Sequence, residues 1–441
     1  MALTKHPHGP SGIRAVTSWE RVDRIRGAQP VTPDTLIRRA MRAVAARCWL
    51  ITLIAACGAG LLGACGRSPD RDDARSGVIS VPSESDRPLP WSVSLEREIF
   101  RESRDSTPFE TITESMVAVG PRGTIYVYDD IDGMVHLFDS VGGGTGRLGA
   151  RGSGPGEMRA PTAIAVDHGG DLWVFDLAKR GFVRFSPEGV VLPEVLIAAV
   201  HAGGPVRFDG VTLLLSIVEA DTRTRKLRKS LVRLQGQSMQ VVTSVEEALP
   251  RGQRFGDCPV PIVVPRLFEP ILRWSTAGNT LAFVRTAEYR IEVQHDGAAF
   301  MTVGRDISPS TATADAAAAE LLARGASFKA SGCNIPVGTL VKAGGFAEHI
   351  PVIADLVLAP DGALWVRRRG QSDGEGPIDV FTSAGAYEGS LPPQSPFPAL
   401  FVSLDHFLAV RVDSEGSGHL GLYVLNCGLQ ACQPGGVPGR R

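Results

Sequence analysis

Several charged residues fall at equivalent places in the chain and are the first candidates for binding chemistry. Asp129, Asp176 and Arg368 each lie six residues after the glycine of a predicted turn, so equivalent strands would carry them to one rim. Residues 367–369 are three consecutive arginines, which is unfavourable unless acidic groups or an anionic partner balance them. Neutralisation of Arg368 by acidic loops of the same chain is the alternative. The candidate ligand-binding residues are Arg151, Asp129, Asp176, Arg367 and Arg368.

No local metal-binding motif accompanies these residues. The sequence has no His-Glu-x-x-His motif and no calcium-type ladder of aspartates, and its histidines are widely spaced. The loop 152–156 is rich in glycine, but Pro155 removes a backbone donor, so we expect a turn rather than a phosphate-binding loop. Asp129 and Asp176 could equally cap their own turns. The catalytic residues are therefore unknown, and neither a metal nor a cofactor is expected.

One cysteine has a context typical of protein export. Two arginines and no acid lie within residues 41–47, an apolar run rich in Gly and Ala follows, and the run ends at Cys65. This order predicts a signal peptide. The last four residues, Leu62-Gly63-Ala64-Cys65, resemble the bacterial lipobox, in which the cysteine is acylated, for example with palmitate, and becomes the first mature residue. The resemblance implies an exported lipoprotein anchored at the outer membrane or cell surface; an uncleaved anchor helix is the alternative.

Composition divides the chain into further segments. Residues 1–40 are expected to be an over-extended start or leader, 41–64 the signal peptide, and 65–90 a flexible tether rich in Ser, Pro, Asp and Arg. Residues 91–426 would form the folded domain, and 427–441 a C-terminal tail. With 43% hydrophobic residues and a net charge of −1, the chain can bury a large core but has no basic excess, so a nucleic-acid partner is not expected.

Four cysteines remain after the predicted cleavage, which is an even number in an exported chain and indicates disulfides. Cys427 and Cys432 are close in sequence, whereas Cys258 and Cys333 each lie in a long insertion. Of the three possible pairings, geometry favours Cys258–Cys333 with Cys427–Cys432. A zinc site is the alternative, but no Cys-x-x-Cys pair or histidine cluster supports it.

The rest of the chain repeats. Residues 119–129 align with 166–176 at a spacing of 47, and each copy reads as a short apolar strand, a glycine turn and a β-branched or aromatic strand. Weaker copies follow at the turns around 210, 278, 362 and 405. A strand-built repeat of this length is typical of β-propeller blades, so we expect an all-β, six-bladed propeller. Two packed β-sandwiches are the alternative.

The second repeat resembles a known family. The segment 149–158, followed by Pro161 and by Leu172-Trp173-Val174-Phe175-Asp176, is similar to an NHL-type repeat. It resembles the six-bladed propeller lipoproteins of soil and aquatic bacteria. The resemblance implies the fold but no single activity, because NHL-like propellers include binding scaffolds, signalling ectodomains and a few lyases.

Strand order predicts how the propeller closes and where its loops lie. The strand at 92–100 should complete the last blade, because no fourth strand follows residues 420–425. The connections between the second and third strands of each blade, and those between blades, should share one face with the ligand-binding candidates. One short helix is expected within 310–325, in the second insertion, where a Ser/Thr start and a glycine stop flank a run of helix formers.

Two functions fit this architecture. The first is a binding module, anchored to the membrane by its lipid, whose loop-rich face meets a peptide, glycan or protein partner. The alternative is a metal-dependent hydrolase or lyase with carboxylates and histidines converging on the central channel. Three such side chains around one point would favour the enzyme. A channel lined by backbone and apolar side chains would favour the binding module.

Overall fold

The computed structural model divides the chain into two units, Met1–Arg75 and Ser76–Arg441. It describes residues 77–81, 85–100, 109, 112–197, 201–236, 238–256, 258, 261–323, 335–370, 375–412 and 418–427, all within the second unit. The predicted signal peptide, Cys65, Cys333 and Cys432 lie outside these residues. Among the described residues, no helix is both long and apolar enough to cross a membrane.

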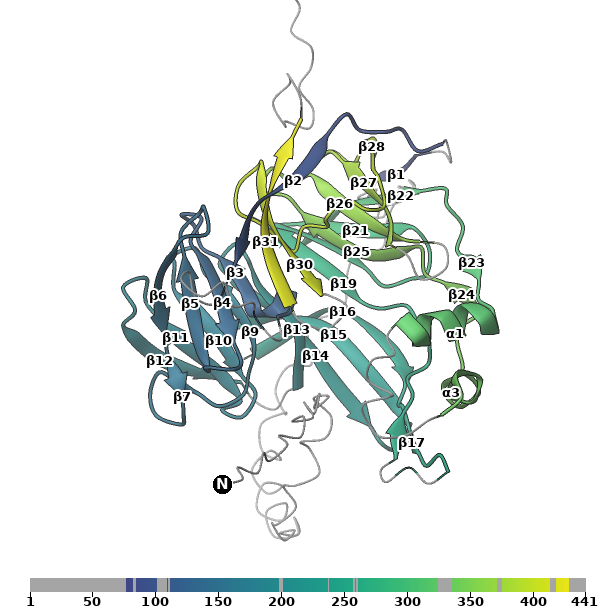
Figure 1. Cartoon of the computed structure of the whole chain (residues 1–441), viewed down its shortest axis with the longest axis horizontal. Coiled ribbons are helices and arrows are strands. Elements are labelled where there is room, and N and C mark those ends of the chain that lie inside the picture. The colour runs from purple at the N-terminus through teal and green to yellow at the C-terminus, as the bar shows by residue number, and fades with distance from the viewer. Residues whose placement is uncertain are drawn as a thin grey trace, which may run out of the picture. The chain divides into compact units, whose positions relative to one another are not determined.

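Six sheets, each built on four antiparallel strands, account for most of the second unit (Figure 1). Blade 1 consists of β3 (Val117–Val119), β4 (Ile125–Asp129), β5 (Met134–Phe138) and β6 (Gly144–Leu148). Blade 2 consists of β9 (Pro161–Val166), β10 (Leu172–Asp176), β11 (Gly181–Phe185) and β12 (Val191–Leu196). Blade 3 consists of β13 (His201–Asp209), β14 (Thr212–Asp221), β15 (Lys226–Gln235) and β16 (Ser238–Ala248).

The other three blades follow the same order. Blade 4 consists of β19 (Arg273–Ala277), β20 (Thr280–Val284), β21 (Arg290–His295) and β22 (Ala298–Arg305). Blade 5 consists of β25 (Ile353–Leu358), β26 (Leu364–Arg369), β27 (Glu375–Phe381) and β28 (Tyr387–Leu391). Blade 6 consists of β29 (Leu400–Phe401), β30 (His406–Val412), β31 (Gly418–Asn426) and β2 (Ser92–Ile99). The first strand of each blade lies innermost, and the sheets make a six-bladed β-propeller, as the repeats predict.

Apolar clusters between neighbouring blades hold the ring together. Each blade buries both of its faces, which explains why strands such as β4 and β10 are apolar or aromatic at nearly every position. Between blades 1 and 2, for example, Tyr126 and Val135 pack with Ile164 and Val174. Similar clusters join blades 2 and 3, 3 and 4, 4 and 5, 5 and 6, and 6 and 1.

The N-terminal strand closes the ring as predicted. β2 pairs antiparallel with β31 from Ser92 opposite Asn426 to Ile99 opposite Leu420 and becomes the outer strand of blade 6. Ile99 is only 1% exposed and packs in the cluster between blades 6 and 1. The closure therefore joins the two ends of the propeller through hydrogen bonds and through the core.

Part of the segment predicted to be a tether, residues 65–90, belongs to the propeller instead. Strand β1 (Gly77–Val81) pairs parallel with β22 and adds a fifth strand to blade 4. Pro88 bridges to Ser390 in blade 5, and Arg87 donates to the carbonyl oxygens of Glu388 and Tyr387. The polar composition of this segment predicted a solvated linker. That prediction was wrong for residues 77–81 and 85–90 because their partners belong to blades 4 and 5, which lie far away in the sequence. Residues 77–81 and 85–90 are therefore part of the folded unit.

Two insertions pack on each other beside blades 4 and 5. The first contains β17 (Gly252–Gln253) and β18 (Ile262–Val263), and the second contains β23 (Ser310–Thr311), α1 (Ala314–Ala323), α3 (Val337–Gly344) and β24 (His349–Ile350). Leu267 exchanges backbone hydrogen bonds with Gly345 and Ala347 across them. Half-buried Cys258 packs against the shared core, which includes Leu321 and Leu340.

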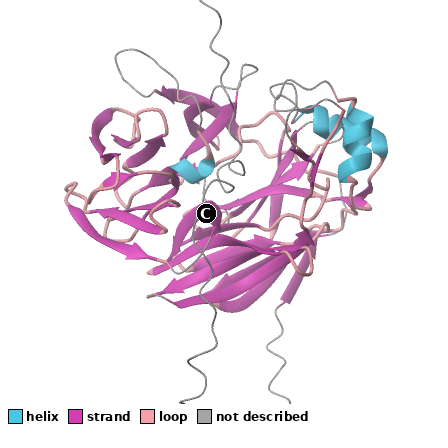
Figure 2. Cartoon of the chain, turned by 90° about the horizontal axis from the view of Figure 1, so that it is seen from below, coloured by secondary structure: helices cyan, strands magenta, loops and turns pink. Residues whose placement is uncertain are grey.

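The expectation of one helix is incomplete. Helix α1 is the predicted one, and the side chain of Thr313 caps it by accepting from the backbone N–H of Ala316 at 3.1 Å. The second helix, α3, was not predicted, because two of its eight residues are glycines, at 338 and 344, and a third glycine follows at 345. Figure 2 shows both helices together at one side of the strands.

Candidate functional site

The two aspartates of the predicted ligand face serve their own turns. Asp129 is 3% exposed and accepts from the backbone N–H of Ile131 at 2.9 Å. Asp176 is fully buried and accepts from the backbone N–H groups of Arg159, Ala178 and Lys179 at 2.6 to 3.0 Å. Both carboxylates therefore stabilise loops at the ends of β4 and β10, which matches the structural alternative for them.

The three consecutive arginines are held by partners within the chain. The guanidinium group of Arg367 donates to the carbonyl oxygens of residues 376, 393 and 395. Arg368 pairs with Asp86 and with Asp379, whose carboxylate lies 3.3 Å from its Nε. Arg369 pairs with Glu320 of α1 at 3.1 Å. Internal neutralisation therefore accounts for this run without an anionic partner.

Arg151 also makes local contacts. Its guanidinium donates to the carbonyl oxygens of Asp130 and Ile131 in the neighbouring turn of blade 1. The glycine-rich loop around it joins two short parallel strands, β7 (Ala150–Arg151) and β8 (Glu157–Met158), and no helix follows. The loop is a connection between blades, as expected. Arg151 thus meets the turn after Asp129, but these residues do not converge with Arg367 and Arg368 on blade 5.

One group of side chains has metal-ligand chemistry. Asp129, Asp132 and His136 place one ligand atom each within 4.8 Å of the others, and no second such group occurs among the described residues. His136 is 2% exposed, and its Nε2 lies 2.7 Å from Asp132 Oδ2 and 4.0 Å from Asp129 Oδ2. The group belongs to the β4–β5 turn of blade 1 and is not part of the central channel.

A spacing associated with serine nucleophiles also occurs once, at Gly370-Gln371-Ser372-Asp373-Gly374. Residues 371–374 lie outside the described part of the chain. The strands that flank them, β26 and β27, pair antiparallel with each other. A nucleophile elbow needs a strand followed by a helix, so this spacing lacks the required context.

A cavity lies on the propeller axis. It has a volume of about 640 Å³ and is lined by the innermost strands of all six blades. These strands contribute, one from each blade, Val119, Val166, Arg207, Arg273, Leu356 and Leu400. The 3-10 helix Glu114–Met116, which precedes β3 and contacts β9 and β13, adds Glu114 to the lining. A cavity of this size can enclose a small organic molecule.

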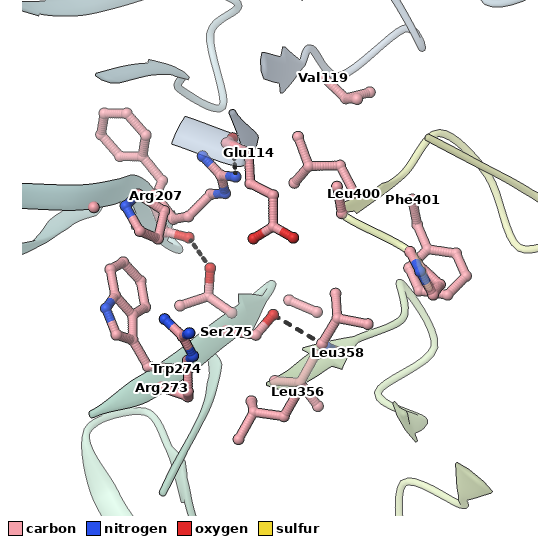
Figure 3. A pocket seen from close by; sticks show the side chains of 18 of the residues that line it. Glu114, Val119, Arg207, Arg273, Trp274, Ser275, Leu356, Leu358, Leu400 and Phe401 are labelled. Carbon is pink, nitrogen blue, oxygen red and sulfur yellow. Dashed lines mark hydrogen bonds between the residues drawn. The ribbon is translucent and has the colours of Figure 1, made fainter. Parts of the chain in front are cut away.

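The charged side chains that line this cavity are Glu114, Asp167, Arg207, Lys229, Arg273 and Asp355. Arg207 on β13 donates to the backbone oxygens of Val206 at 2.9 Å and Glu114 at 3.1 Å. Arg273 on β19 donates from Nε to the carbonyl of Ala354 at 3.2 Å, and the same Nε lies 4.0 Å from Asp355 Oδ1. Figure 3 shows the carboxylate of Glu114 pointing into the cavity between Arg207 and Leu400.

The Glu114 carboxylate has unusual surroundings. Water in the channel reaches it, but the blades enclose it, and within the described part of the chain it accepts no hydrogen bond and lies within 4.0 Å of no basic group. Burial and the negative charge of Asp355 raise its pKa to about 7, against the opposing effect of Arg207 and Arg273. A perturbed, unbonded carboxylate in an enclosed cavity is typical of a functional site.

The other charged groups respond to the same environment. Burial lowers the pKa of Arg207 to about 10, although the charge of Glu114 opposes this. Burial also raises the pKa of Asp355, and Arg273 acts in the opposite direction. The cavity therefore weakens the charged form of both signs, because the blades replace water around these groups.

Apolar side chains form the opposite wall. Leu356 and Leu358 of β25 and Leu400 and Phe401 of β29 lie on one side of the cavity (Figure 3). The lining also contains Thr276, whose hydroxyl group donates to the carbonyl of Phe208 at 3.0 Å. The cavity thus combines a hydrophobic surface with a few charged groups, which is the usual composition of a small-molecule site.

Sequence reasoning missed these channel residues. Arg207, Arg273 and Asp355 each interrupt an apolar strand just before a repeat turn, at positions 210, 278 and 362. A charge in the innermost strand of a predicted blade was a usable signal, because that strand lines the axis. Glu114 had no comparable signal, since it lies in a short 3-10 helix outside the repeats.

Comparison with known proteins agrees with the fold. Residues 102–195 match the family DUF5128, described as a 6-bladed beta-propeller. No curated protein matches the sequence. The chain is similar in structure to a protein of Bacteroides fragilis that is inferred to be exported, with 10% identity, a TM-score of 0.46, and coverage of 79% of this chain and 99% of that one.

Two enzymes are also similar to it in structure. A gluconolactonase from Xanthomonas campestris has 13% identity and a TM-score of 0.34, with coverage of 78% of this chain and 99% of that one. Virginiamycin B lyase from Staphylococcus aureus has 10% identity and a TM-score of 0.34, with coverage of 76% and 99%. These similarities are too distant to carry an activity to this chain.

Proposed function

We propose that this six-bladed propeller is a binding protein that holds a small organic molecule in its axial cavity. The observation that carries the proposal is the carboxylate of Glu114, which points into an enclosed space of about 640 Å³ without a hydrogen bond from any described residue. Channel water solvates this carboxylate, and a ligand that donates to it would replace that water with a direct hydrogen bond in a cavity that also offers apolar surface.

The cavity gives less support to the metal-dependent enzyme. Its described lining contains the carboxylates of Glu114, Asp167 and Asp355 and the imidazole of His168, and these side chains do not form a three-ligand group. Asp167 is already engaged, since it accepts from Trp173 Nε1 at 3.0 Å. A hydrolase or lyase of the metal-dependent kind would need a ligand set that the described lining does not provide, whereas a binding role needs none.

The location of this function is part of the proposal. We place the protein outside the cytoplasm, anchored to the membrane through lipid on Cys65, because of the lipobox-like sequence at 62–65. The loop-rich face remains available for a peptide, glycan or protein partner. Its predicted residues are committed to internal contacts, however, so we place the principal ligand in the channel.

A channel-filling variant tests the proposal. Leu400→Trp should fill part of the cavity, whereas Leu196→Trp places the same side chain on the outer strand β12, where Leu196 is 62% exposed. Thermal-shift screening of the full chain against amino acids, short peptides, sugars and organic acids should find compounds that raise the Tm. Leu400→Trp should abolish that shift and Leu196→Trp should keep it. A screen without hits, or hits unaffected by Leu400→Trp, would refute the proposal.

A further inference from the structure

The charged groups of the cavity differ in how far the protein already satisfies them. Asp355 accepts from the backbone N–H of Leu356 at 2.9 Å, and Arg207 is bonded to backbone oxygens. Lys229, also in the lining, pairs with Glu247 at 2.7 Å. Two groups have no hydrogen-bond partner among the described residues and are called open groups below. They are the carboxylate of Glu114 and the terminal nitrogens of Arg273.

These two open groups have opposite charges and do not meet. Glu114 makes no ion pair with Arg273 within 4.0 Å, although the charge of Arg273 lowers the pKa of both Glu114 and Asp355. Arg273 keeps 43% of its side chain exposed to the channel. A partner that reaches both groups must therefore carry two separated charges, a positive one for Glu114 and a negative one for Arg273.

A ligand with a single charge fits less well. The acids and bases of the lining balance formally, with three of each. A simple anion placed at Arg273 would therefore also face Glu114 and Asp355. A simple cation placed at Glu114 would face both arginines. Because electrostatic interactions strengthen where protein replaces water, these unfavourable contacts would oppose binding.

We propose, on the basis of the binding function above, that the channel takes a small zwitterion with an apolar body, of the amino-acid or short-peptide class. Its ammonium group would bind Glu114 and its carboxylate would bind Arg273. Its aliphatic side chains would pack on the wall formed by Leu356, Leu358 and Leu400. The volume of about 640 Å³ leaves room for a dipeptide.

The protonation of Glu114 gives the proposal a pH dependence. Asp355, Arg207 and Arg273 are the charged groups that act on this carboxylate, and its pKa is raised to about 7. An ammonium group binds the ionised carboxylate, so affinity for the zwitterion should rise between pH 6 and pH 7.5. In Glu114→Gln that rise should disappear.

Three matched probes test the inference by isothermal titration calorimetry on the full chain. They are leucyl-leucine, its N-acetyl derivative, which lacks the ammonium group, and its amide, which lacks the carboxylate. We expect each derivative to bind at least tenfold more weakly than leucyl-leucine. Glu114→Gln should remove the difference between the dipeptide and its N-acetyl derivative, and Arg273→Gln should remove the difference between the dipeptide and its amide.

Controls separate the possible failures. Arg285→Gln, which alters an exposed ion pair with Glu292 on blade 4, should leave all three affinities unchanged. Equal binding of the derivatives, persistence of the differences in the variants, or no binding of any probe would overturn the zwitterion. If other compounds still bind in a manner sensitive to Leu400→Trp, the channel function stands while this inference fails. If no compound does so, both fail.

Discussion

At the scale of single residues, the raised pKa of Glu114 links folding stability to pH. The folded protein holds this proton up to a pKa of about 7, whereas the ordinary value is 4.5. The contribution to stability is therefore complete below pH 4.5 and is lost as the pH rises through 7. Glu114→Gln should remove this dependence and stabilise the protein at pH 8 by roughly 1 kcal/mol, a value reduced for screening by channel water.

Urea unfolding at pH 5 and pH 8 measures this effect. Glu348→Gln is the control, because it makes the same substitution at a side chain that is 85% exposed and outside the cavity. If wild type and Glu114→Gln lose stability equally between the two pH values, the enclosed carboxylate is not responsible.

Asp379 lies at the centre of a buried ionic network. It is fully buried and accepts from Tyr289 at 2.7 Å, from Ser390 at 2.5 Å and from Arg305 at 3.1 Å, and it lies 3.3 Å from Arg368. Asp379→Asn would leave two arginine charges with less compensation, and removal of one partner from a buried pair costs about 3–5 kcal/mol. Chemical denaturation should show this loss.

Asp86 provides a comparison with Asp379, because it pairs with the same arginines from a more exposed position. It pairs with the same two arginines, Arg305 and Arg368, but 40% of its side chain is exposed. Water can replace its contacts, so Asp86→Asn should cost only about 1 kcal/mol or less. A loss as large as that of Asp379→Asn would mean that the docked segment 85–90 contributes far more than its exposure implies.

At the scale of elements, the closing strand β2 should contribute strongly to stability. Ile99 is 1% exposed in the cluster between blades 6 and 1, whereas Leu95 on the same strand is 46% exposed. Ile99→Ala should destabilise the fold by about 2–4 kcal/mol, because it leaves a cavity in that core. Leu95→Ala should cost under about 1 kcal/mol, since most of its surface already meets water. Equal losses in thermal or urea unfolding would show that β2 acts through its backbone alone.

The two insertions provide a second prediction at this scale. Their shared core brings Cys258 next to the second insertion, where Cys333 belongs in sequence, so the Cys258–Cys333 pairing stays our prediction together with Cys427–Cys432. The first bond would close a far longer loop, so Cys258→Ser with Cys333→Ser should cost about 3–4 kcal/mol, and loss of the second bond less. Non-reducing peptide mapping that finds free thiols or another pairing would disprove the assignment.

At the scale of the whole molecule, maturation should determine where the propeller works. The lipobox-like residues 62–65 predict that Cys65 is acylated and becomes the first residue. Cys65→Ser should therefore abolish incorporation of labelled palmitate and release the protein from the membrane fraction, while a serine at Cys57 should change neither. Intact-mass analysis that finds residues 41–64 retained in the mature protein would contradict this.

The sequence alone determined the six blades, because each repeat carries its own turn and its own apolar strands. Gly123, Gly170 and Gly362 adopt positive φ angles of 75° to 90° in these turns, as local sequence predicts. It also determined the closing strand, since an unpaired edge needs a partner.

Only the tertiary structure decided which charged side chains form ion pairs within the protein and which still lack a hydrogen-bond partner among the described residues. Arg368, which the sequence singled out, meets Asp86 and Asp379 from distant parts of the chain. Glu114 and Arg273, which the sequence did not single out, both line the axial cavity because six blades close around it. The physical reason is that pairing and burial depend on contacts between segments far apart in sequence, whereas turns and strand periodicity are local.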